Sequence, residues 1–334
     1  MYSRFFSKNV NTERFTYYED VYPTNVLYNL DFAVKKWKKS RNYSETSKDF
    51  VFNAVRDSSA RQREVYVMVI GETGRAESWS LYGYDRKTNP KLEQKNNLYH
   101  FSDAITQSNV THKSVSIMLS TASAEDYDII YQQKSIIEAF REVGFTTVFL
   151  SNQGANHTFT EYFAQEADCY DNIRSGKDGI MTVNKYDDAL LPLFEHYLDS
   201  VQNNLFVVIH TYGSHFKYNE RYPDEFSVFK PDDVTEIRRQ DRDKLVNAYD
   251  NTILYTDGFL SKVIDLLNSE DLCSTVFYSS DHGEDILDDN RMRFLHSSPS
   301  PTFYQLKIPM FVWFSDNYIK NFPGKVKKCR KQQK

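Results

Sequence analysis

Five short apolar runs recur along the chain after its first sixty residues. They occupy residues 65–70, 146–151, 205–210, 274–280 and 308–314. Each run is nearly continuous in apolar residues rather than alternating between apolar and polar. This pattern is typical of strands that are buried on both faces of a mostly parallel sheet.

Stretches with helical spacing of apolar residues lie between these runs. The first, Lys134 to Val143, stops at Gly144, a residue that commonly caps a helix C-terminus. Residues 189–201 and 245–267 carry similar apolar stripes, and the charged stretch 231–244 predicts a loop that leads into a solvated helix face. The alternation predicts an α/β fold with a doubly wound, mostly parallel central sheet and helices on both faces.

The two ends of the chain differ from this pattern. An amphipathic stretch, 25–37, followed by positive charge, predicts a helix that either packs on the domain or lies near a membrane surface. The last ten residues are rich in lysine and arginine, which predicts a solvated or disordered tail. We therefore expect a connecting segment at 1–60, a main domain at 61–322 and a basic tail at 323–334.

Composition narrows the class of protein. The 334 residues are 40% hydrophobic and 26% charged, an ordinary globular balance, and 15% are aromatic. The net charge of −5 argues against a general nucleic-acid binder. No apolar run reaches the ~18 residues of a membrane span, and no signal-peptide pattern is present at the start. A protein of this sequence that works outside the cytoplasm would need a targeting segment beyond it.

The cysteines carry little information. Cys169, Cys273 and Cys329 contain no CxxC pair, and their spacing argues against a cysteine-based zinc site. Isolated thiols, with Cys273 buried beside its strand, are the favoured interpretation, and a single disulfide is the alternative.

The chemistry gathers where the predicted strands end. Glu72 follows the first run, and Asp281-His282 follows the run 274–280. His210 and His215 also follow predicted strands. Ligands of open α/β sheets bind outside the carboxyl ends of the strands, so we expect all five side chains to converge. Two carboxylates and an imidazole suit Zn²⁺ or Mn²⁺ with a position left open. His210 also ends a strand, but we interpret it as a structural residue.

Thr111 is the candidate nucleophile. It precedes a short apolar stretch and is expected at a helix N-terminus, where free N–H groups and the helix dipole favour phosphate. A metal at its hydroxyl would make an alkoxide accessible near neutral pH. Taken alone, Thr111 would be an ordinary N-cap. Only Glu72 and Asp281-His282 favour the catalytic interpretation.

Two loop histidines and a lysine complete the candidates. His215 and His296 would ordinarily be surface polar groups. Beside a phosphoryl-transfer site they become candidate proton donors, phosphate ligands or ligands of a second metal. Lys113, two residues after Thr111, is a candidate substrate contact.

These residues occur in an order that resembles the bacterial phosphoethanolamine transferases. The shared segments are Gly71-Glu72-Thr73-Gly74-Arg75, the Thr111 segment, Gly213-Ser214-His215, Ser280-Asp281-His282-Gly283-Glu284 and Leu295-His296, with Tyr82-Gly83-Tyr84 and Arg221-Tyr222-Pro223 also in place. Asp-His-Gly alone is a weak signal, whereas the ordered set is strong and covers roughly residues 20–320. Those enzymes carry a sulfatase-like domain of the alkaline phosphatase superfamily.

The resemblance implies a role for each matching residue. Glu72, Thr111, Asp281 and His282 correspond to the zinc ligands, with Thr111 also the nucleophile. His215 and His296 correspond to histidines that handle the substrate phosphate or a second zinc. His157 aligns loosely with a substrate-contacting position.

The resemblance also implies a setting. Its members move phosphoethanolamine from phosphatidylethanolamine to lipid A phosphates or other envelope glycans, and N-terminal transmembrane helices hold the catalytic domain at the periplasmic face of the inner membrane. This chain resembles the domain without that anchor. Many relatives have disulfides around the site, which three cysteines cannot build, and Ile117 stands where a relative's cysteine lies. The Cys/Ser-x-Pro-x-Arg signature is absent at Thr111, which disfavours a formylglycine sulfatase.

Two other functions stay open from the sequence. A phosphodiesterase or a phosphoglycerol transferase would use the same residues, because hydrolysis and transfer differ only in what accepts the group. A metal-binding domain without catalysis is the other alternative, although it would have no need of the Thr111 nucleophile.

Overall fold

The computed structural model describes residues 22–56, 60–154, 158–174, 185–234, 236–268 and 270–333. Internal contacts divide the chain into two units, Met1–Asp49 and Phe50–Lys334. The division falls earlier than the predicted boundary at residue 60. The backbone N–H groups of Phe52 and Ala54 donate to the Glu142 carboxylate at 2.7 and 2.9 Å, which ties this segment to the second unit.

The first unit contains two described helices, α3 (Thr24–Arg41) and α4 (Tyr43–Thr46). α3 covers the predicted amphipathic helix and ends in Lys38, Lys39 and Arg41, where positive charge complements the helix dipole. No residue of α3 is buried. Among the residues that the structure describes, none of the helices combines the length and the apolar character that a membrane crossing requires.

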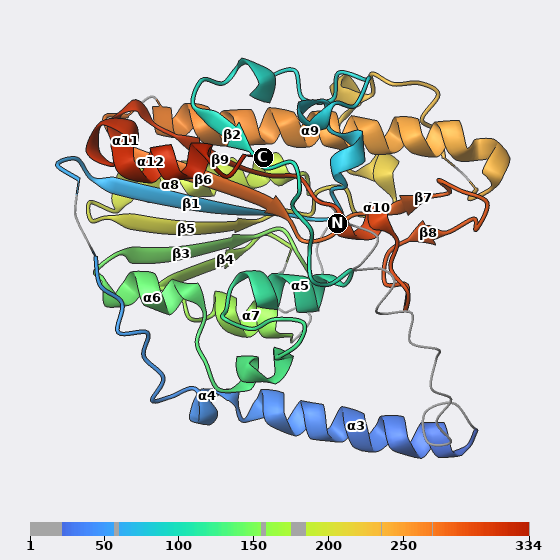
Figure 1. The fold of residues 1–334 in the computed structure, drawn as a ribbon, viewed down its shortest axis with the longest axis horizontal. Helices are drawn as coiled ribbons and strands as arrows, with labels where there is room; N and C mark the ends of the chain where they lie inside the picture. Colours follow the sequence, from blue (N-terminus) through green and yellow to red (C-terminus); the bar gives the residue numbers. More distant parts are fainter. Residues whose placement is uncertain are drawn as a thin grey trace. The chain divides into compact units, whose positions relative to one another are not determined.

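A seven-stranded sheet forms the centre of the second unit (Figure 1). Its order is β2-β9-β6-β1-β5-β3-β4. The strands are β1 (Glu64–Gly71), β2 (Leu98–His100), β3 (Thr146–Ser151), β4 (Cys169–Asn172), β5 (Leu205–His210), β6 (Cys273–Ser280) and β9 (Met310–Phe314). All pairs from β6 to β4 are parallel, and β9 runs antiparallel to both its neighbours. A separate two-stranded sheet joins β7 (Asp285–Ile286) to β8 (Phe294–Leu295).

The five predicted strands are therefore confirmed, as is the mostly parallel sheet. Strands β2 and β4 were not predicted. Both are short and only partly buried, so they lack the apolar run that marks a central strand. The antiparallel direction of β9 also leaves no trace in its apolar sequence.

Helices cover both faces of the sheet, with α9 on one side and α6 and α7 on the other (Figure 1). The remaining α-helices are α5 (Thr111–Met118), α6 (Ile136–Glu142), α7 (Phe159–Ala164), α8 (Leu191–Ser200), α9 (Arg242–Asn268), α10 (Phe303–Leu306), α11 (Asp316–Asn321) and α12 (Pro323–Arg330). Short 3-10 turns connect them: η1 (Ala76–Ser78), η2 (Ser80–Tyr82), η3 (Leu92–Gln94), η4 (Tyr127–Tyr131), η5 (Asp187–Leu190), η6 (Tyr218–Glu220), η7 (Asp224–Phe226) and η8 (Arg239–Asp241).

Alternate side chains of β1 pack on opposite faces of the sheet. Val65 and Val67 join a core cluster that includes Phe259 of α9, whereas Tyr66 stacks on Phe145 with ring centroids 5.4 Å apart. Successive side chains of a strand point to opposite faces, so one strand serves two cores. Burial of each such valine stabilises the folded state by about 1.5–3 kcal/mol. This burial holds the strands of the sheet, and therefore their ends, in position.

The predicted helices are confirmed with shifted ends. The side chain of Ser135 accepts a hydrogen bond from Ile137 N and so caps α6, and Gly144 ends this helix with φ +85°. The loop before α9 is present. However, the prediction that this loop leads into a solvated helix face is wrong, because α9 is buried along most of its length from Leu245 onward.

The basic tail is ordered rather than disordered, although most of its described residues are exposed, as a solvated tail would be. Residues Pro323–Arg330 form α12, and Val326 is buried with 3% of its surface exposed. Pro323 suits the first turn of a helix, and the basic residues cluster in the last turn, where the dipole favours them. The high charge of this segment therefore gave no indication of α12, whose single buried residue is Val326. The three cysteines are unpaired and Cys273 is buried, as expected.

Candidate metal centre

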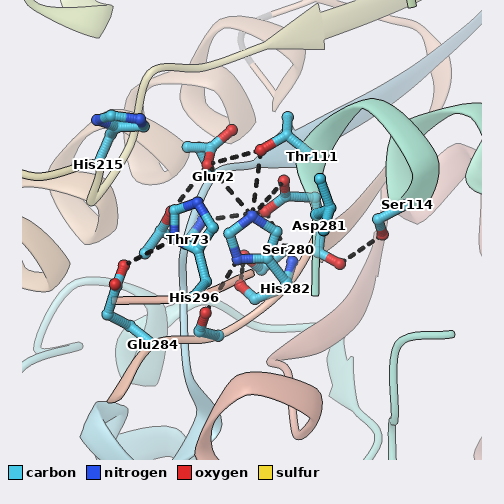
Figure 2. Close-up of polar contacts among 12 residues, drawn as sticks. Glu72, Thr73, Thr111, Ser114, His215, Ser280, Asp281, His282, Glu284 and His296 are labelled. Atoms are coloured by element: carbon cyan, nitrogen blue, oxygen red, sulfur yellow. Dashed lines mark hydrogen bonds and ion pairs between the residues drawn. The ribbon is translucent and has the colours of Figure 1, made fainter. Parts of the chain in front are cut away.

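Three buried side chains meet at the carboxyl edge of the sheet (Figure 2). Glu72, Asp281 and His282 each offer one ligand atom, and these atoms lie within 4.8 Å of one another. Glu72 follows β1, and the other two follow β6. The parallel register of these strands, which pairs Gly71 with Ser280, brings the two strand ends side by side. The sequence prediction that Glu72, Asp281 and His282 converge is confirmed, whereas His210 and His215, which the same rule included, are not among the ligand groups.

Hydrogen bonds from the backbone and the side chain of Thr73 orient the carboxylates. Thr73 N donates to Asp281 Oδ1 at 3.0 Å, and Thr73 Oγ1 donates to Glu72 Oε1 at 2.8 Å. The backbone N–H of Asp281 donates to the Gly71 carbonyl at 2.9 Å, which continues the strand pairing. The turn after β1 thus orients both acids at once.

One hydrogen bond sets the tautomer of His282. Its Nδ1 lies 2.9 Å from the carbonyl oxygen of Gly283, which can only accept, so Nδ1 carries the proton. Nε2 then presents its lone pair to the centre, 3.3 Å from Asp281 Oδ2 and 3.5 Å from Glu72 Oε1. Metal-binding histidines are commonly oriented by such a bond at the opposite nitrogen.

Thr111 joins the cluster from α5. Its Oγ1 lies 3.1 Å from Glu72 Oε1 and 3.1 Å from His282 Nε2. Val110, not Thr111, is the N-cap of α5, and the hydroxyl makes no capping bond. The ordinary N-cap interpretation of Thr111 is therefore wrong. Ser114, one turn further along α5, donates to the Asp281 carbonyl at 2.5 Å and ties the helix to the strand end.

The electrostatics of the cluster call for a cation. Burial and the neighbouring Asp281 raise the pKa of Glu72 above its ordinary value, and burial raises the pKa of Asp281 to about 7. Burial lowers the pKa of His282 to about 4, so its imidazole is neutral at neutral pH. Asp281 Oδ2 is buried and has no hydrogen-bond partner among the described residues. A divalent ion would offset the cost of burying both acids, so the residues present fit Zn²⁺ or Mn²⁺.

Two further histidines flank this centre. The ring of His296 lies 4.2 Å from that of His282, centroid to centroid, and 6.2 Å from that of His215. His215 Nδ1 lies 2.6 Å from the Phe216 carbonyl, so this nitrogen carries the proton. His296 Nδ1 lies 3.4 Å from the buried carboxylate of Glu284. Both predicted histidines therefore lie beside the cluster, as Figure 2 shows.

The loop that carries His215 is held by a close backbone approach. Gly213 has φ +46°, and a Cβ there would lie 2.7 Å from the Glu72 carbonyl oxygen. The backbone N–H of Gly213 donates to the buried carboxylate of Asp187 at 3.0 Å. Burial raises the pKa of Asp187. A side chain at position 213 would push this loop away from Glu72.

Sequence reasoning missed Gln153. Its Nε2 donates to Glu72 Oε2 at 3.1 Å and to the Thr211 carbonyl at 2.8 Å. It thus supports a candidate metal ligand from the end of β3. Its position just after a predicted strand was the available signal, because the same strand-end rule identified Glu72 and Asp281.

Three other candidates have different outcomes. Lys113 is exposed on α5 and forms no ion pair with any residue that the structure describes. His157 lies outside the described residues. His210, at the end of β5, is buried and is not one of the three ligand groups, and burial lowers its pKa to about 3.

Comparison with known proteins adds the family. Residues 64–332 match the family described as Sulfatase. The chain is 31% identical over 271 residues to phosphoethanolamine transferase EptA of Escherichia coli K12, covering 78% of this chain and 48% of that protein. It is 30% identical to Kdo(2)-lipid A phosphoethanolamine 7''-transferase of the same strain, over 76% of this chain and 45% of that protein. The chain therefore spans about half the length of these curated relatives.

Solved structures agree with this match. The soluble domain of lipooligosaccharide phosphoethanolamine transferase A from Neisseria meningitidis has a TM-score of 0.72 at 31% identity, covering 83% of this chain and 84% of that one. The C-terminal periplasmic domain of EptC from Escherichia coli, in complex with zinc, has a TM-score of 0.73 at 26% identity, over 80% and 77% of the two chains. The chain belongs to the sulfatase family, and its similarity within that family is to the phosphoethanolamine transferases.

Proposed function

We propose that this chain is the catalytic domain of a zinc-dependent phosphoethanolamine transferase in which Thr111 carries the transferred group. The observation that carries the proposal is the position of the Thr111 hydroxyl, 3.1 Å from both Glu72 Oε1 and His282 Nε2. A buried metal-binding domain without catalysis would have no use for a hydroxyl aimed at its ligands.

Glu72, Thr111, Asp281 and His282 are the residues that would hold the ion. Zn²⁺ suits two carboxylates, an imidazole and a hydroxyl, and Mn²⁺ is the alternative. When bound, the ion lowers the pKa of the hydroxyl and neutralises charge on the phosphoryl group. The zinc complex of the similar EptC domain supports the choice of zinc.

The residues of the chain divide a two-step exchange among them. In the first step Thr111 Oγ1 attacks the donor phosphorus, the bond from phosphorus to the diacylglycerol oxygen breaks, and that oxygen leaves with a proton. In the second step the acceptor oxygen attacks the same phosphorus, and the Thr111 oxygen leaves. We assign to His215 and His296 the protonation of the leaving oxygen and the deprotonation of the acceptor, and their position beside the cluster supports this assignment. The N-terminus of α5 favours negative charge at Thr111.

The names of the similar proteins suggest the substrates. We propose phosphatidylethanolamine as the donor and lipid A or another envelope glycan as the acceptor. The integral membrane transferase EptA from Neisseria meningitidis matches 98% of this chain and 61% of that protein, with a TM-score of 0.77 at 28% identity. We therefore place the domain at the periplasmic face of the inner membrane, carried by a transmembrane domain beyond this sequence. The net charge of −5 fits the absence of a nucleic-acid substrate.

The test is the intact mass of the zinc-loaded protein after exposure to phosphatidylethanolamine, with phosphatidylglycerol as a parallel donor. We expect a phosphoethanolamine adduct that maps to Thr111, is absent in Thr111→Ala and is reduced in Thr111→Ser. An adduct from phosphatidylglycerol alone would make the protein a phosphoglycerol transferase. Cleavage of the donor without any adduct and with unchanged turnover in Thr111→Ala would remove Thr111 as the nucleophile.

A further inference from the structure

A narrow pocket opens beside Thr111. Its lining comes from the ends of β3, β4 and β5 and from α7: Thr111, Phe149, Ser151, Gln153, Gly154, Thr160, Glu161, Ala164, Tyr170, Asn172 and His210. Gln153 connects the pocket to the centre, because its side chain also donates to Glu72. Neither the proposed metal ligands apart from Thr111 nor the flanking histidines line this pocket.

Two buried polar side chains of the pocket have no hydrogen-bond partner. Neither ring nitrogen of His210 is paired with any described residue, although the residue is 99% buried, with 1% of its surface exposed. Thr160 Oγ1 is likewise unpaired in a residue that is 9% exposed. Buried polar groups are normally hydrogen-bonded, and leaving one unpaired costs about 1–3 kcal/mol. Two such groups in one pocket therefore indicate a polar ligand.

The charge of the lining indicates a cation. Glu161 is the single charged side chain among the described lining residues, and His210 is neutral because of its burial. The aromatic ring of Tyr170 adds a negative face that favours cations. An anion such as phosphate would find no positive side chain among the described residues of this lining. A neutral imidazole nitrogen, a hydroxyl oxygen and a carboxylate match the three donors of a primary ammonium.

The size of the pocket limits the cation. About 20 Å³ is free for the centre of a water-sized group, and roughly 10–15 Å³ is enough for one water molecule. An ammonium group is similar in size to water and fits. A trimethylammonium group is several times larger than a water molecule and exceeds this space.

We propose that this pocket binds the primary ammonium of the ethanolamine headgroup while its phosphorus lies at Thr111. This inference rests on the proposed function and adds the part of the site that selects the headgroup. His210, Thr160 and Glu161 accept hydrogen bonds from the ammonium, and the narrow walls exclude its methylated forms. The pocket is thus a specificity site for primary amines, separate from the groups that handle the phosphate.

The test compares four donors that differ only in methylation of the headgroup nitrogen: phosphatidylethanolamine, its N-methyl and N,N-dimethyl forms, and phosphatidylcholine. The rate of adduct formation on Thr111 is followed by intact mass for the wild-type protein. We expect the rate to fall with each added methyl group. For phosphatidylcholine it should be at least about tenfold lower than for phosphatidylethanolamine, because the loss of even one hydrogen bond to a charged group costs about that much.

The decisive variant is Thr160→Val, which keeps the shape of the side chain and removes an unpaired hydroxyl. We expect an adduct rate from phosphatidylethanolamine about tenfold lower than in the wild type, and a smaller difference between the four donors. The unfolding temperature should stay the same or rise, because no hydrogen bond of the fold is lost. Thr256→Val in α9 is the matched control, since its hydroxyl is paired with the Thr252 carbonyl at 2.9 Å, far from the pocket in sequence. This control should keep the wild-type preference.

The outcomes distinguish failure of the proposed function from failure of the proposed ammonium pocket alone. If the wild-type protein forms no adduct from any donor, the proposed function fails and the inference fails with it. If it forms adducts at equal rates from all four donors, only the inference is overturned. A Thr160→Val protein that slows all donors equally, or none, also overturns it, because a group that merely supports the fold would not discriminate between headgroups.

Discussion

The hydroxyl oxygen of Thr111 lies 3.1 Å from Nε2 of His282, although 171 positions separate the two residues in the sequence. The contact joins the first turn of α5 to the end of β6. It places a hydroxyl beside the lone pair of an imidazole whose other nitrogen is held by the Gly283 carbonyl. This arrangement is the one that the proposed group transfer requires, because a buried polar cluster that only stabilises the fold has no need of a hydroxyl aimed at the ligands.

Gln153→Leu should weaken zinc binding without unfolding the protein. The substitution leaves Glu72 Oε2 without the donor that lies 3.1 Å from it. Loss of such an outer partner typically costs about 10–100-fold in metal affinity. Competition with a zinc chelator measures the change. Gln202→Leu is the matched control, because Gln202 is exposed and its one hydrogen bond to a described residue is to the Asp199 carbonyl. Equal zinc affinities of the two variants would contradict the role given to Gln153.

Gly213→Ala should destabilise the protein by about 1–3 kcal/mol. The new Cβ would lie 2.7 Å from the Glu72 carbonyl oxygen, and φ +46° is unfavourable for alanine. Denaturant unfolding measures the free energy change. Gly324→Ala in α12 is the control, since nothing lies within 4 Å of its Cβ position, and alanine there should stabilise the helix by about 0.5–1 kcal/mol. A neutral effect at 213 would show that the loop and Glu72 are less tightly packed than described.

The stability of the metal-free protein should depend on pH because of Asp281. Its folded-state pKa is raised by burial to about 7 from an ordinary value of 3.8. The folded state therefore binds more protons than the unfolded state between these values, and this contribution to stability is present below about pH 4 and is lost as the pH rises to about 7. Metal-free Asp281→Asn should lack this loss.

The measurement is the difference in unfolding free energy between wild type and Asp281→Asn across pH 4 to 8 with chelator present. We expect the variant to gain on the wild type as the pH rises, because asparagine removes the buried charge. His282, whose pKa burial lowers to about 4, acts in the opposite direction in both proteins and largely cancels in the difference. A difference that does not vary with pH would mean that Asp281 is solvated in the metal-free state.

His215→Ala and His296→Ala should lower the rate of transfer while zinc content is retained. Both rings flank the cluster without belonging to its three ligand groups, and loss of a general acid or base typically costs about 10²–10⁴-fold in rate. Rates of adduct formation and decay, measured beside zinc per chain, test this. His282→Ala is the contrast, because it should lose zinc as well. Loss of zinc in His296→Ala would instead make His296 a ligand.

Much of the fold could be predicted because buried parallel strands have a simple sequence pattern. The runs that became β1, β3, β5, β6 and β9 are apolar on both faces, so their existence did not depend on long-range information. Strands such as β4, with the sequence CYDN, form only because β3 offers an edge, and no local pattern marks that edge. The helix α12 was hidden for a similar reason, since a single buried valine anchors a basic segment.

The residues of the candidate site likewise differ in whether a local sequence pattern marks them. Glu72, Asp281 and His282 could be found because they follow recognisable strands, and parallel strands bring their ends together. Thr111 could be chosen only in the context of Glu72 and Asp281-His282, because a threonine at a helix start is ordinarily a cap. The pocket formed by His210 and Thr160 could not be predicted. It depends on the side chains of α7 facing the end of β5, and only coordinates show which buried polar groups lack partners.

The central claim is that Glu72, Thr111, Asp281 and His282 surround a single divalent ion. The most direct measurement is a crystal structure of the zinc-loaded protein with anomalous data collected at the zinc absorption edge. The account predicts one strong peak among these four side chains, at about 2.0–2.2 Å from each ligand atom. A zinc-saturated crystal with no peak there, or with zinc held only by other residues, would contradict it.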